Sequence, residues 1–591
     1  MAGKPKPLFY VIVVVVILGL VGFALYKAGI LAPKGGGSGS GTSAKIDKNA
    51  LDKIRGKNKG TAAGSGKSVE APDGKAHTTV KEYKFVASSK LPPVKGISKY
   101  DKMKGRTVKF ALNVWAGWAP IIFANNGLKP GKVWKDGNGK PFKLHLVLID
   151  DPVKMRDAYA SGKVHIGWAT LDMIPLMMEG FSKDSRIMPR VYQQVDWSNG
   201  GDGIVARGGV QNVNGLRGKT IALAQNSPSE FFLLNALINA GVQPAEVKFK
   251  YTGDAFQAAA AFNADKNIAA CVSWAPDIYN LSKIKGNKLI VSTATANKLI
   301  ADVWFARADF AKDHKPILEG IVRGIFDAMI DLKDPTNKPK VATLMGKAFN
   351  LPAKEAMGML GDAHSTNYAE NREFFLNQNN PANFERTWDT AYYLYQRMGK
   401  VKAADKVSFD KVMDFSIIKK LGKVAKYANQ KNEYDVRFTP KSVTTIKAES
   451  GEILTKTITI HFYPNSWEIR KMVTKTVDGK TKQILYDPNV PFLLEEIGKL
   501  SGQYGAARIV IEGHTDSSMK GKVPFSGVRE LSLNRARAVK EALVKKFKSL
   551  NPNQFSVEGM GWKKPYDEND PMNHAKNRRV EVKVYPLEKQ G

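Results

Sequence analysis

Cysteine is almost absent from this chain, which carries a single one, Cys271, among 591 residues. One cysteine excludes a disulfide framework and a cysteine-rich zinc site. Because its AACVSW surroundings are apolar, we expect a buried structural thiol rather than a nucleophile. The sequence also lacks the GxSxG, HExxH and P-loop motifs and a Cys/His nucleophile pair. We therefore expect a protein that is not an enzyme and that needs no cofactor.

Acidic residues are scarce relative to basic ones, with 55 Asp and Glu against 90 Lys and Arg and a formal net charge of +35. This balance favours polyanionic partners: nucleic acid, anionic lipid head groups or cell-wall polymers. No nucleic-acid reading motif is recognisable, so we expect no nucleic-acid partner. The length exceeds what one hydrophobic core can hold and predicts two or three domains.

Charge is missing altogether from Leu8 to Tyr26, an apolar run of 19 residues. At about 1.5 Å per residue, such a run just spans a hydrocarbon core of about 30 Å. It exceeds the roughly 7 to 15 apolar residues of a cleavable signal, so we interpret it as an uncleaved transmembrane helix. The run contains no Asp or Glu and so lacks the carboxylate that a proton-driven stator needs.

This helix sets the expected compartment of the rest of the chain. Residues 1–7 are then a short cytoplasmic N-terminus, and the bulk of the chain lies in the periplasm, held at the inner membrane. Residues 27–97 are rich in Gly, Ser, Lys and Thr and poor in large apolar residues. That composition predicts a flexible basic linker.

From residue 98 to 435, short apolar runs such as TVKFALNV, FKLHLVLI and KTIALA alternate with helix-like stretches. This alternation predicts an α/β domain with largely parallel sheets and a ligand at the carboxyl ends of the strands. Hydroxyls at helix N-termini there can hold an anion. The tryptophans equally fit packing between lobes. The candidate solute-binding residues are Trp118, Thr170, Asp202, Ser227, Ser229 and Trp274.

Motifs in this region follow one another as WAGWAP, DWSNGGDGIVAR, LRGKTIALAQNSPSEFFLLNALINAGV and VSTATANKLIADVWFAR. Together they make roughly residues 106 to 400 resemble the nitrate, sulfonate and taurine type of periplasmic substrate-binding proteins. The resemblance implies a two-lobed domain that closes on a small, often anionic solute, as the receptors of ABC transporters do. Where these proteins often show WEP, this chain has Trp274, Ala275 and Pro276, and the identity of the solute stays open.

Residues 436–591 show strand-like and helix-like stretches that predict an α+β domain, among them TKTITIHF, PFLLEEIGKLSGQY, ARIVIEG and RRVEVKVY. The stretch LSLNRARAVKEALVKKF predicts a helix for which Ser532 is suited as N-cap. Arg535 then lies in the first turn, where the helix dipole disfavours a cation. We therefore expect an anion close to Arg535.

The blocks HFYPNSWEI, IEGHTDSS, LSLNRARAV, VEGMGWKKP and NRRVEV make roughly residues 436 to 587 resemble the peptidoglycan-binding domain of the outer-membrane-protein-A (OmpA) family, which MotB shares. In that family the Asp of the HTD motif and the Arg of LSxxRA hold the zwitterionic end of diaminopimelate in the stem peptide. By position, the resemblance assigns these roles to Asp516 and Arg535. The carboxylate of Asp516 can pair with the ammonium group of diaminopimelate, and the guanidinium of Arg535 can pair with its carboxylate.

Other residues of these blocks carry further expectations. Thr515 belongs to the HTD motif, and Asn577 and Arg578 either line the site or fasten the last strand. Val528 stands where the family usually has Asn, so one hydrogen bond is expected to be missing. We expect His514 to be structural and not a metal ligand, because no second His or Cys lies at ligand spacing.

The predicted fold class is multidomain: a single transmembrane helix, a two-lobed α/β domain over 98–435 and an α+β domain over 436–591. We predict a membrane-anchored periplasmic protein that binds peptidoglycan without a covalent step and, through its middle domain, a small, often anionic solute. The alternative is a scaffold or accessory subunit of a cell-envelope membrane complex, stator-like or transport-associated. In that case the middle domain binds a membrane-complex protein instead of a solute.

Overall fold

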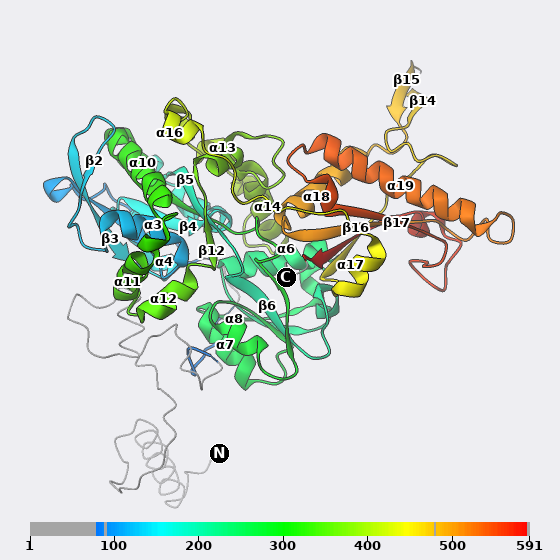
Figure 1. Ribbon diagram of the computed structural model, residues 1–591, viewed down its shortest axis with the longest axis horizontal. Coiled ribbons are helices and arrows are strands. Elements are labelled where there is room, and N and C mark those ends of the chain that lie inside the picture. Colours follow the sequence, from blue (N-terminus) through cyan, green and yellow to red (C-terminus); the bar gives the residue numbers. More distant parts are fainter. Residues whose placement is uncertain (1–77, 88–90, 478–479, 588–591) are drawn as a thin grey trace, which may run out of the picture. The chain divides into compact units, whose positions relative to one another are not determined.

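The computed structural model describes residues 78–87, 91–477 and 480–587 (Figure 1). The predicted membrane helix over residues 8–26 lies outside them, as does most of the predicted linker. Within the described ranges, no helix is both long enough and apolar enough to cross a membrane.

The first lobe of the middle domain contains a seven-stranded sheet in the order β12-β5-β11-β4-β1-β3-β2. Helices cover both faces, so every residue of β4 and β11 is buried, as expected for strands at the centre of an α/β sheet. Its strands are β1 (Thr107–Leu112), β2 (Val133–Lys135), β3 (Pro141–Leu148), β4 (Ile166–Thr170), β5 (Pro189–Ser198), β11 (Ala301–Arg307) and β12 (Ala363–Ser365).

The helices around this sheet come from two stretches of the chain, one before β5 and one after β11. The first group is α3 (Ala119–Asn125), α4 (Pro152–Ala160) and α5 (Ile174–Phe181). The second group is α9 (Ala308–Asp313), α10 (Lys315–Asp331), α11 (Lys338–Phe349), α12 (Ala353–Met359), α13 (Tyr368–Leu376), α14 (Phe384–Arg397), α15 (Ser416–Leu421) and α16 (Ala425–Ala428).

The second lobe is a five-stranded sheet in the order β10-β6-β9-β7-β8 with helices on both faces. Alternate residues of β9 enter different apolar clusters: Ala270 and Val272 join the main core, and Cys271 joins a second cluster with α7 and α8. The prediction of a buried thiol is confirmed. The elements are β6 (Asp202–Arg207), β7 (Thr220–Ala224), α6 (Pro228–Asn239), β8 (Lys248–Thr252), α7 (Ala255–Ala264), β9 (Ala270–Trp274), α8 (Asp277–Ser282) and β10 (Asn287–Ser292).

The prediction of largely parallel sheets is wrong. In the first lobe only β1 pairs in parallel, with β3 and β4, whereas β11 runs antiparallel to both β4 and β5. In the second lobe β6 is antiparallel to β9 and β10. The physical reason is that β5 and β11 connect directly to strands of the other lobe. They enter their sheets without a helical crossover, which parallel neighbours require.

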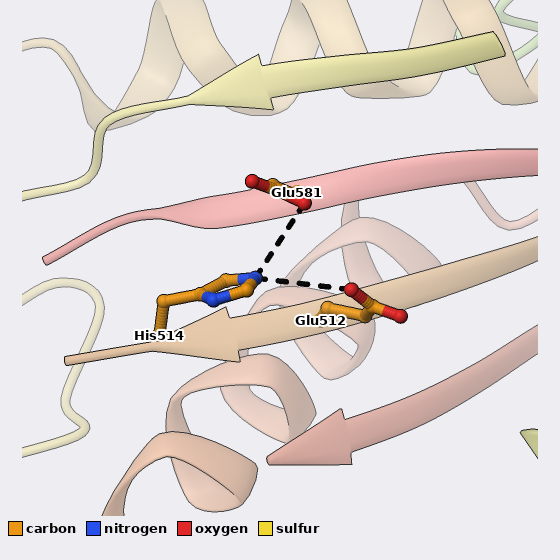
Figure 2. Close-up of side chains that lie close together, drawn as sticks. All are labelled: Glu512, His514 and Glu581. Carbon is orange, nitrogen blue, oxygen red and sulfur yellow. Dashed lines mark ion pairs between the residues drawn. The ribbon is translucent and has the colours of Figure 1, made fainter. Parts of the chain in front are cut away.

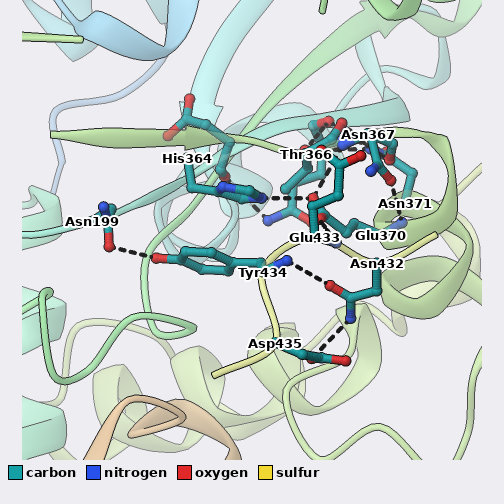
Figure 3. A network of polar contacts seen from close by, with 12 residues as sticks. Asn199, His364, Thr366, Asn367, Glu370, Asn371, Asn432, Glu433, Tyr434 and Asp435 are labelled. Carbon is teal, nitrogen blue, oxygen red and sulfur yellow. Dashed lines mark hydrogen bonds and ion pairs between the residues drawn. The ribbon is translucent and has the colours of Figure 1, made fainter. Parts of the chain in front are cut away.

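Residues 199–201 lead from β5 into β6, and a polar network surrounds this crossing between the lobes (Figure 3). The Tyr434 hydroxyl donates to Asn199 Oδ1 at 2.9 Å, and the His364 ring stacks on Tyr434 with 3.8 Å between ring centroids. His364 Nε2 lies 2.8 Å from Glu370 Oε2, and Glu370 also accepts the Glu433 backbone N–H. The segment that leads toward the C-terminal domain is thereby fastened beside the crossing.

The C-terminal domain has a four-stranded sheet in the order β13-β18-β16-β17. The central strand β16 is buried throughout and pairs in parallel with β17 and antiparallel with β18. Both α18 and α19 belong to its core, and α17 contacts β17. The elements are α17 (Val443–Glu449), β13 (Leu454–Ile458), α18 (Val490–Gln503), β16 (Ala507–His514), α19 (Phe525–Lys546), β17 (Phe555–Gly561), α20 (His574–Asn577) and β18 (Val580–Pro586). The hairpin of β14 (Met472–Val477) and β15 (Lys480–Leu485) was not predicted.

The expected N-cap at Ser532 is wrong, because α19 begins seven residues earlier, at Phe525, with Pro524 as its N-cap. Ser532 is an interior residue whose Oγ donates to the Arg529 carbonyl at 2.8 Å and accepts the Gly561 N–H at 3.0 Å. Arg535 therefore lies in the interior of α19 and not in its first turn. The helix dipole therefore gives no reason to expect an anion close to Arg535, since the effect of the dipole fades beyond the first turn.

Candidate functional site

A cavity of about 250 Å³ is lined by residues of both lobes of the middle domain. Four predicted residues line it, Thr170 at the end of β4, Asp202 at the start of β6, Ser227 before α6 and Trp274 at the end of β9. They come from strand ends and helix starts, as the sequence predicts.

Two of the predicted solute-binding residues do not line this cavity. The Trp118 ring is fully buried against Phe110, and its Nε1–H donates to Asn113 Oδ1 at 2.6 Å. Ser229 is also fully buried, because it lies inside the first turn of α6. The prediction for both residues is corrected: Trp118 packs in the core, and Ser229 is buried in α6.

The cavity is strongly acidic, although the chain as a whole is basic. Among the residues that the structure describes, its lining contains five aspartates and one basic residue, Lys154, whose Nζ lies 3.5 Å from Asp151 Oδ2. Four aromatic side chains complete the lining. The aspartates are Asp150, Asp151, Asp202, Asp254 and Asp302, and the aromatic residues are Trp115, Trp168, Phe256 and Trp274.

Burial raises the pKa values of carboxyls in this lining, Asp202 and Asp302, and of two that are not part of it, Asp172 and Asp196. Burial raises the pKa of Asp202 to about 7, although a hydrogen bond from Ser198 acts to lower it. Burial also raises the pKa of Asp172 to about 7. Asp302 and Asp196 are cross-strand neighbours whose carboxyls hydrogen-bond to one another. Burial and the nearby Asp196 raise the pKa of Asp302 well above its usual range. Burial therefore disfavours the charged form of these carboxyls in the ligand-free protein.

We expect the thermal stability of the ligand-free protein to fall as pH rises from 5 to 8. A carboxyl whose pKa is higher in the folded state binds more protons there than in the unfolded state, so stability is present at low pH and lost as pH rises through the folded pKa. For Asp202 the window runs from about 4 to about 7, and the largest loss is about 4 kcal/mol. Melting curves of wild type and Asp202→Asn test this: the variant should lose less stability over the window. Parallel curves would contradict it.

The predicted peptidoglycan site lies where β16 ends. Asp516 is 5% exposed, and its Oδ2 accepts from Arg578 Nε at 2.5 Å and lies 2.9 Å from His574 Nδ1. The Ser518 N–H donates to the other carboxylate oxygen at 2.8 Å. Burial opposes ionisation, but the hydrogen bonds from Ser518, His574 and Arg578 outweigh it and hold the pKa of Asp516 well below its usual range. Asp516 is therefore a fixed negative charge.

Arg535 projects from the interior of α19 and is also 5% exposed. Its Nε donates to the Ser466 carbonyl at 3.1 Å, and its guanidinium lies 5.0 Å from the centre of the Phe462 ring. Burial and the neighbouring Arg578 lower its pKa to about 10, so it stays charged at neutral pH. In the described part of the chain, no carboxylate lies within ion-pair distance of it. A buried cation without a carboxylate partner is costly and suits an anionic ligand.

The other predicted residues of this site differ in their roles. Arg578 forms the ion pair with Asp516. Thr515 is 7% exposed and donates its N–H to the Gly561 carbonyl at 2.9 Å. The Asn577 side chain is fully buried and bonds the backbone of Tyr566, Asp570 and Asn573. Asn577 therefore fixes the loop that leads into β18, and it is Arg578 that reaches the charged centre.

His514 lies between Glu512 and Glu581, 3.8 Å and 3.6 Å from their carboxylates (Figure 2). Their ligand atoms are close enough to hold a metal ion. The two carboxylates are already neutralised, Glu512 by Lys447 at 2.6 Å and Glu581 by Arg579 at 2.6 Å, and Lys583 lies 3.7 Å from both. Burial lowers the pKa of His514 to about 4. Since cations repel a metal ion, the prediction that His514 is structural still stands as our interpretation.

Comparison with known proteins finds a family match in each of the two domains that hold these candidate sites. The OmpA family matches residues 480–579, and the family described as NMT1/THI5 like matches residues 138–337. The taurine-binding periplasmic protein of Escherichia coli strain K12 is 27% identical over 267 residues, which cover 43% of this chain and 78% of that protein. The chain thus carries an OmpA domain toward its C-terminal end and, in its middle, an NMT1/THI5-like domain that is similar to a taurine-binding periplasmic protein.

Solved structures similar to the chain include two periplasmic binding proteins. The aliphatic sulphonate binding protein SsuA from Escherichia coli has a TM-score of 0.39 and 17% identity, covering 51% of this chain and 98% of that one. The nitrate-binding protein NrtA from Synechocystis PCC 6803 has a TM-score of 0.39 and 14% identity, covering 54% of this chain and 88% of that one.

Proposed function

We propose that the C-terminal domain binds peptidoglycan without covalent chemistry, through Asp516, Arg535 and Arg578. The observation that carries this proposal is the buried Arg535 guanidinium, which no carboxylate of the described chain neutralises. A carboxylate of the peptide stem supplies the missing partner, and charge-assisted bonds to a guanidinium are among the strongest hydrogen bonds in proteins. Asp516, already held by Arg578, attracts the ammonium of the same diaminopimelate residue. Sedimentation with purified peptidoglycan tests this proposal.

The middle domain binds a small solute in the cavity between its lobes. Two features support the proposal that the solute binds in this cavity. Residues of both lobes line the cavity, and buried polar side chains lie at the strand ends that face it. Sites in α/β folds occur at such strand ends. The similarity to the taurine-binding periplasmic protein supports a solute-receptor role for this domain. In this proposal the chain acts as a receptor.

The chain is a periplasmic protein fixed to the inner membrane by residues 8–26, so that one molecule joins the membrane to the cell wall. The support for anchoring comes from the uncharged run of 19 residues. We expect the full-length protein to stay in the membrane fraction after an alkaline carbonate wash, because an inserted apolar helix of this length is not displaced by high pH. Immunoblots of the washed membranes measure this. A mature protein that begins near residue 33 and is free in the periplasm would overturn it.

A further inference from the structure

The charge of the solute follows from the lining of the cavity between the lobes, if that cavity is the solute site proposed above. We propose that the cavity selects a small organic cation, an amine whose positive charge is on nitrogen, in preference to an anion such as a sulfonate or nitrate.

The distribution of charge is the first argument. Across the chain, basic residues outnumber acidic ones by 90 to 55, yet the described residues that line the cavity include five aspartates and one lysine, which is paired with Asp151. Asp202 and Asp302 are each 4% exposed, and in the described residues no Lys, Arg or His lies within ion-pair distance of either. An anion would find no cationic side chain at these two carboxyls, whereas a bound cation would favour their ionised form and pair with it.

The helix N-termini at the cavity are the second argument. In anion sites the free N–H groups of a helix start hold the ligand. Here Asp151 caps α4 by accepting from the N–H groups of Val153 and Lys154 at 2.9 Å and 3.1 Å. Asp254 caps α7 by accepting from the Gln257 N–H at 2.9 Å. The chain's own carboxylates thus occupy two of the positions where an anion would bind.

The aromatic residues are the third argument. The rings of Trp115, Trp168, Phe256 and Trp274 contribute to the same lining. The faces of aromatic rings attract cations, and tryptophan does so most strongly. Trp115 is held in place by its Nε1–H, which donates to Asp196 at 3.2 Å. Carboxylates together with indole rings are the combination that recognises an alkylammonium group.

The spacing of the cavity aspartates favours an organic cation over a metal ion as the ligand. Within the described part of the chain, the set of acids and histidines close enough to share a metal is Glu512, His514 and Glu581 in the other domain. The cavity aspartates are not gathered in that way. They surround a space of about 250 Å³, which suits a compact molecule rather than a bare ion.

A series of small molecules that differ in charge tests the proposal with the full-length protein. The probes are ethanolamine and choline as cations, taurine as a zwitterion and isethionate as an anion, at pH 8 and constant ionic strength. Binding is measured by calorimetry and by the shift in melting temperature that a ligand of the folded state produces. We expect the cations to bind and isethionate to give no shift.

Variants of the cavity carboxyls test whether these groups bind the cation. Asp202→Asn and Asp302→Asn should each weaken binding of the cation about ten-fold or more, since each removes a charge-assisted contact. The same variants should raise the melting temperature of the ligand-free protein at pH 8, because they remove a buried charge. The exposed Asp331→Asn on α10 is the control and should change neither quantity.

The outcomes separate this inference from the proposed function. Binding of isethionate or another anion, and not of the amines, overturns the inference and leaves the solute-receptor function intact. Binding of the amines with unchanged affinity in Asp202→Asn and Asp302→Asn also overturns it. If no probe of any charge binds, the solute-receptor function of the cavity fails together with the inference.

Discussion

Arg535→Ala and Asp516→Ala are each expected to reduce sedimentation of the protein with purified peptidoglycan about ten-fold or more. Each loses one charge-assisted contact to the stem peptide, and such contacts contribute about 1.5 to 3 kcal/mol. Arg535→Lys should fall between Ala and wild type, because lysine keeps the charge but loses the planar bidentate fork. Free diaminopimelate should compete with wild type.

The matched control is Arg537→Ala, two residues further along the same helix, where the side chain is exposed and bonds only Asn534 among the described residues. It should sediment as wild type does. Asp516→Asn serves as a second variant, since it keeps the shape of the side chain that Arg578 and His574 contact. Melting curves establish that each variant is folded. Folded Asp516 and Arg535 variants that sediment as well as wild type would show that these residues do not bind the wall.

The arrangement also separates binding from a purely structural role for these charges. If Asp516 and Arg535 formed an ion pair with one another, their loss would lower stability and leave binding unchanged. Instead Asp516 pairs with Arg578 and His574, and Arg535 bonds a backbone carbonyl. The Arg535 side chain is thus oriented without being neutralised. Orientation without neutralisation is what a preorganised carboxylate receptor needs.

The sequence predicted those strands that are continuous apolar runs with polar residues at their ends, whereas β2, β5, β6, β8, β11 and β12 of the middle domain were not predicted as strands. KTIALA and ARIVIEG correspond to β7 and β16 within a residue or two. Strand direction could not be predicted in the same way. The antiparallel course of β11 depends on its return from the other lobe, which is a contact between residues far apart in the chain.

The candidate sites were predicted in part, and the reasons differ between them. The start of α19 was misplaced because FSGVREL has no clear apolar face, while Pro524 was the available signal for an earlier start. Asp302 was missed although it interrupts the otherwise apolar IADVWFA run, and an acid within a buried strand is a signal of function. The Asp516 partners His574 and Arg578 lie in the segment before β18, and the Arg535 partners Phe462 and Ser466 lie between β13 and β14. No local pattern predicts how these two segments fold.

Gly513→Ala is expected to destabilise the C-terminal domain by about 3 kcal/mol or more and to abolish its binding to peptidoglycan. A Cβ atom at Gly513 would lie 2.0 Å from the Ser532 carbonyl oxygen, and one at Gly559 would lie 2.3 Å from the Arg529 carbonyl oxygen. Both neighbours are backbone atoms of α19, so they cannot move unless the whole helix moves. Overpacking of even a few atoms costs about 1 to 3 kcal/mol, and a backbone clash exceeds that.

The glycines of IEGH and VEGM therefore bring α19 close to β16 and β17, and this approach positions Arg535 near Asp516. Gly559→Ala should act in the same direction as Gly513→Ala. The control is Gly527→Ala on α19, where a Cβ meets no atom within 4 Å, so alanine should stabilise the helix by about 0.5 to 1 kcal/mol. Thermal unfolding and sedimentation with peptidoglycan measure both effects. If Gly513→Ala melts at the wild-type temperature, close packing of the helix on these glycines does not set the geometry of the site.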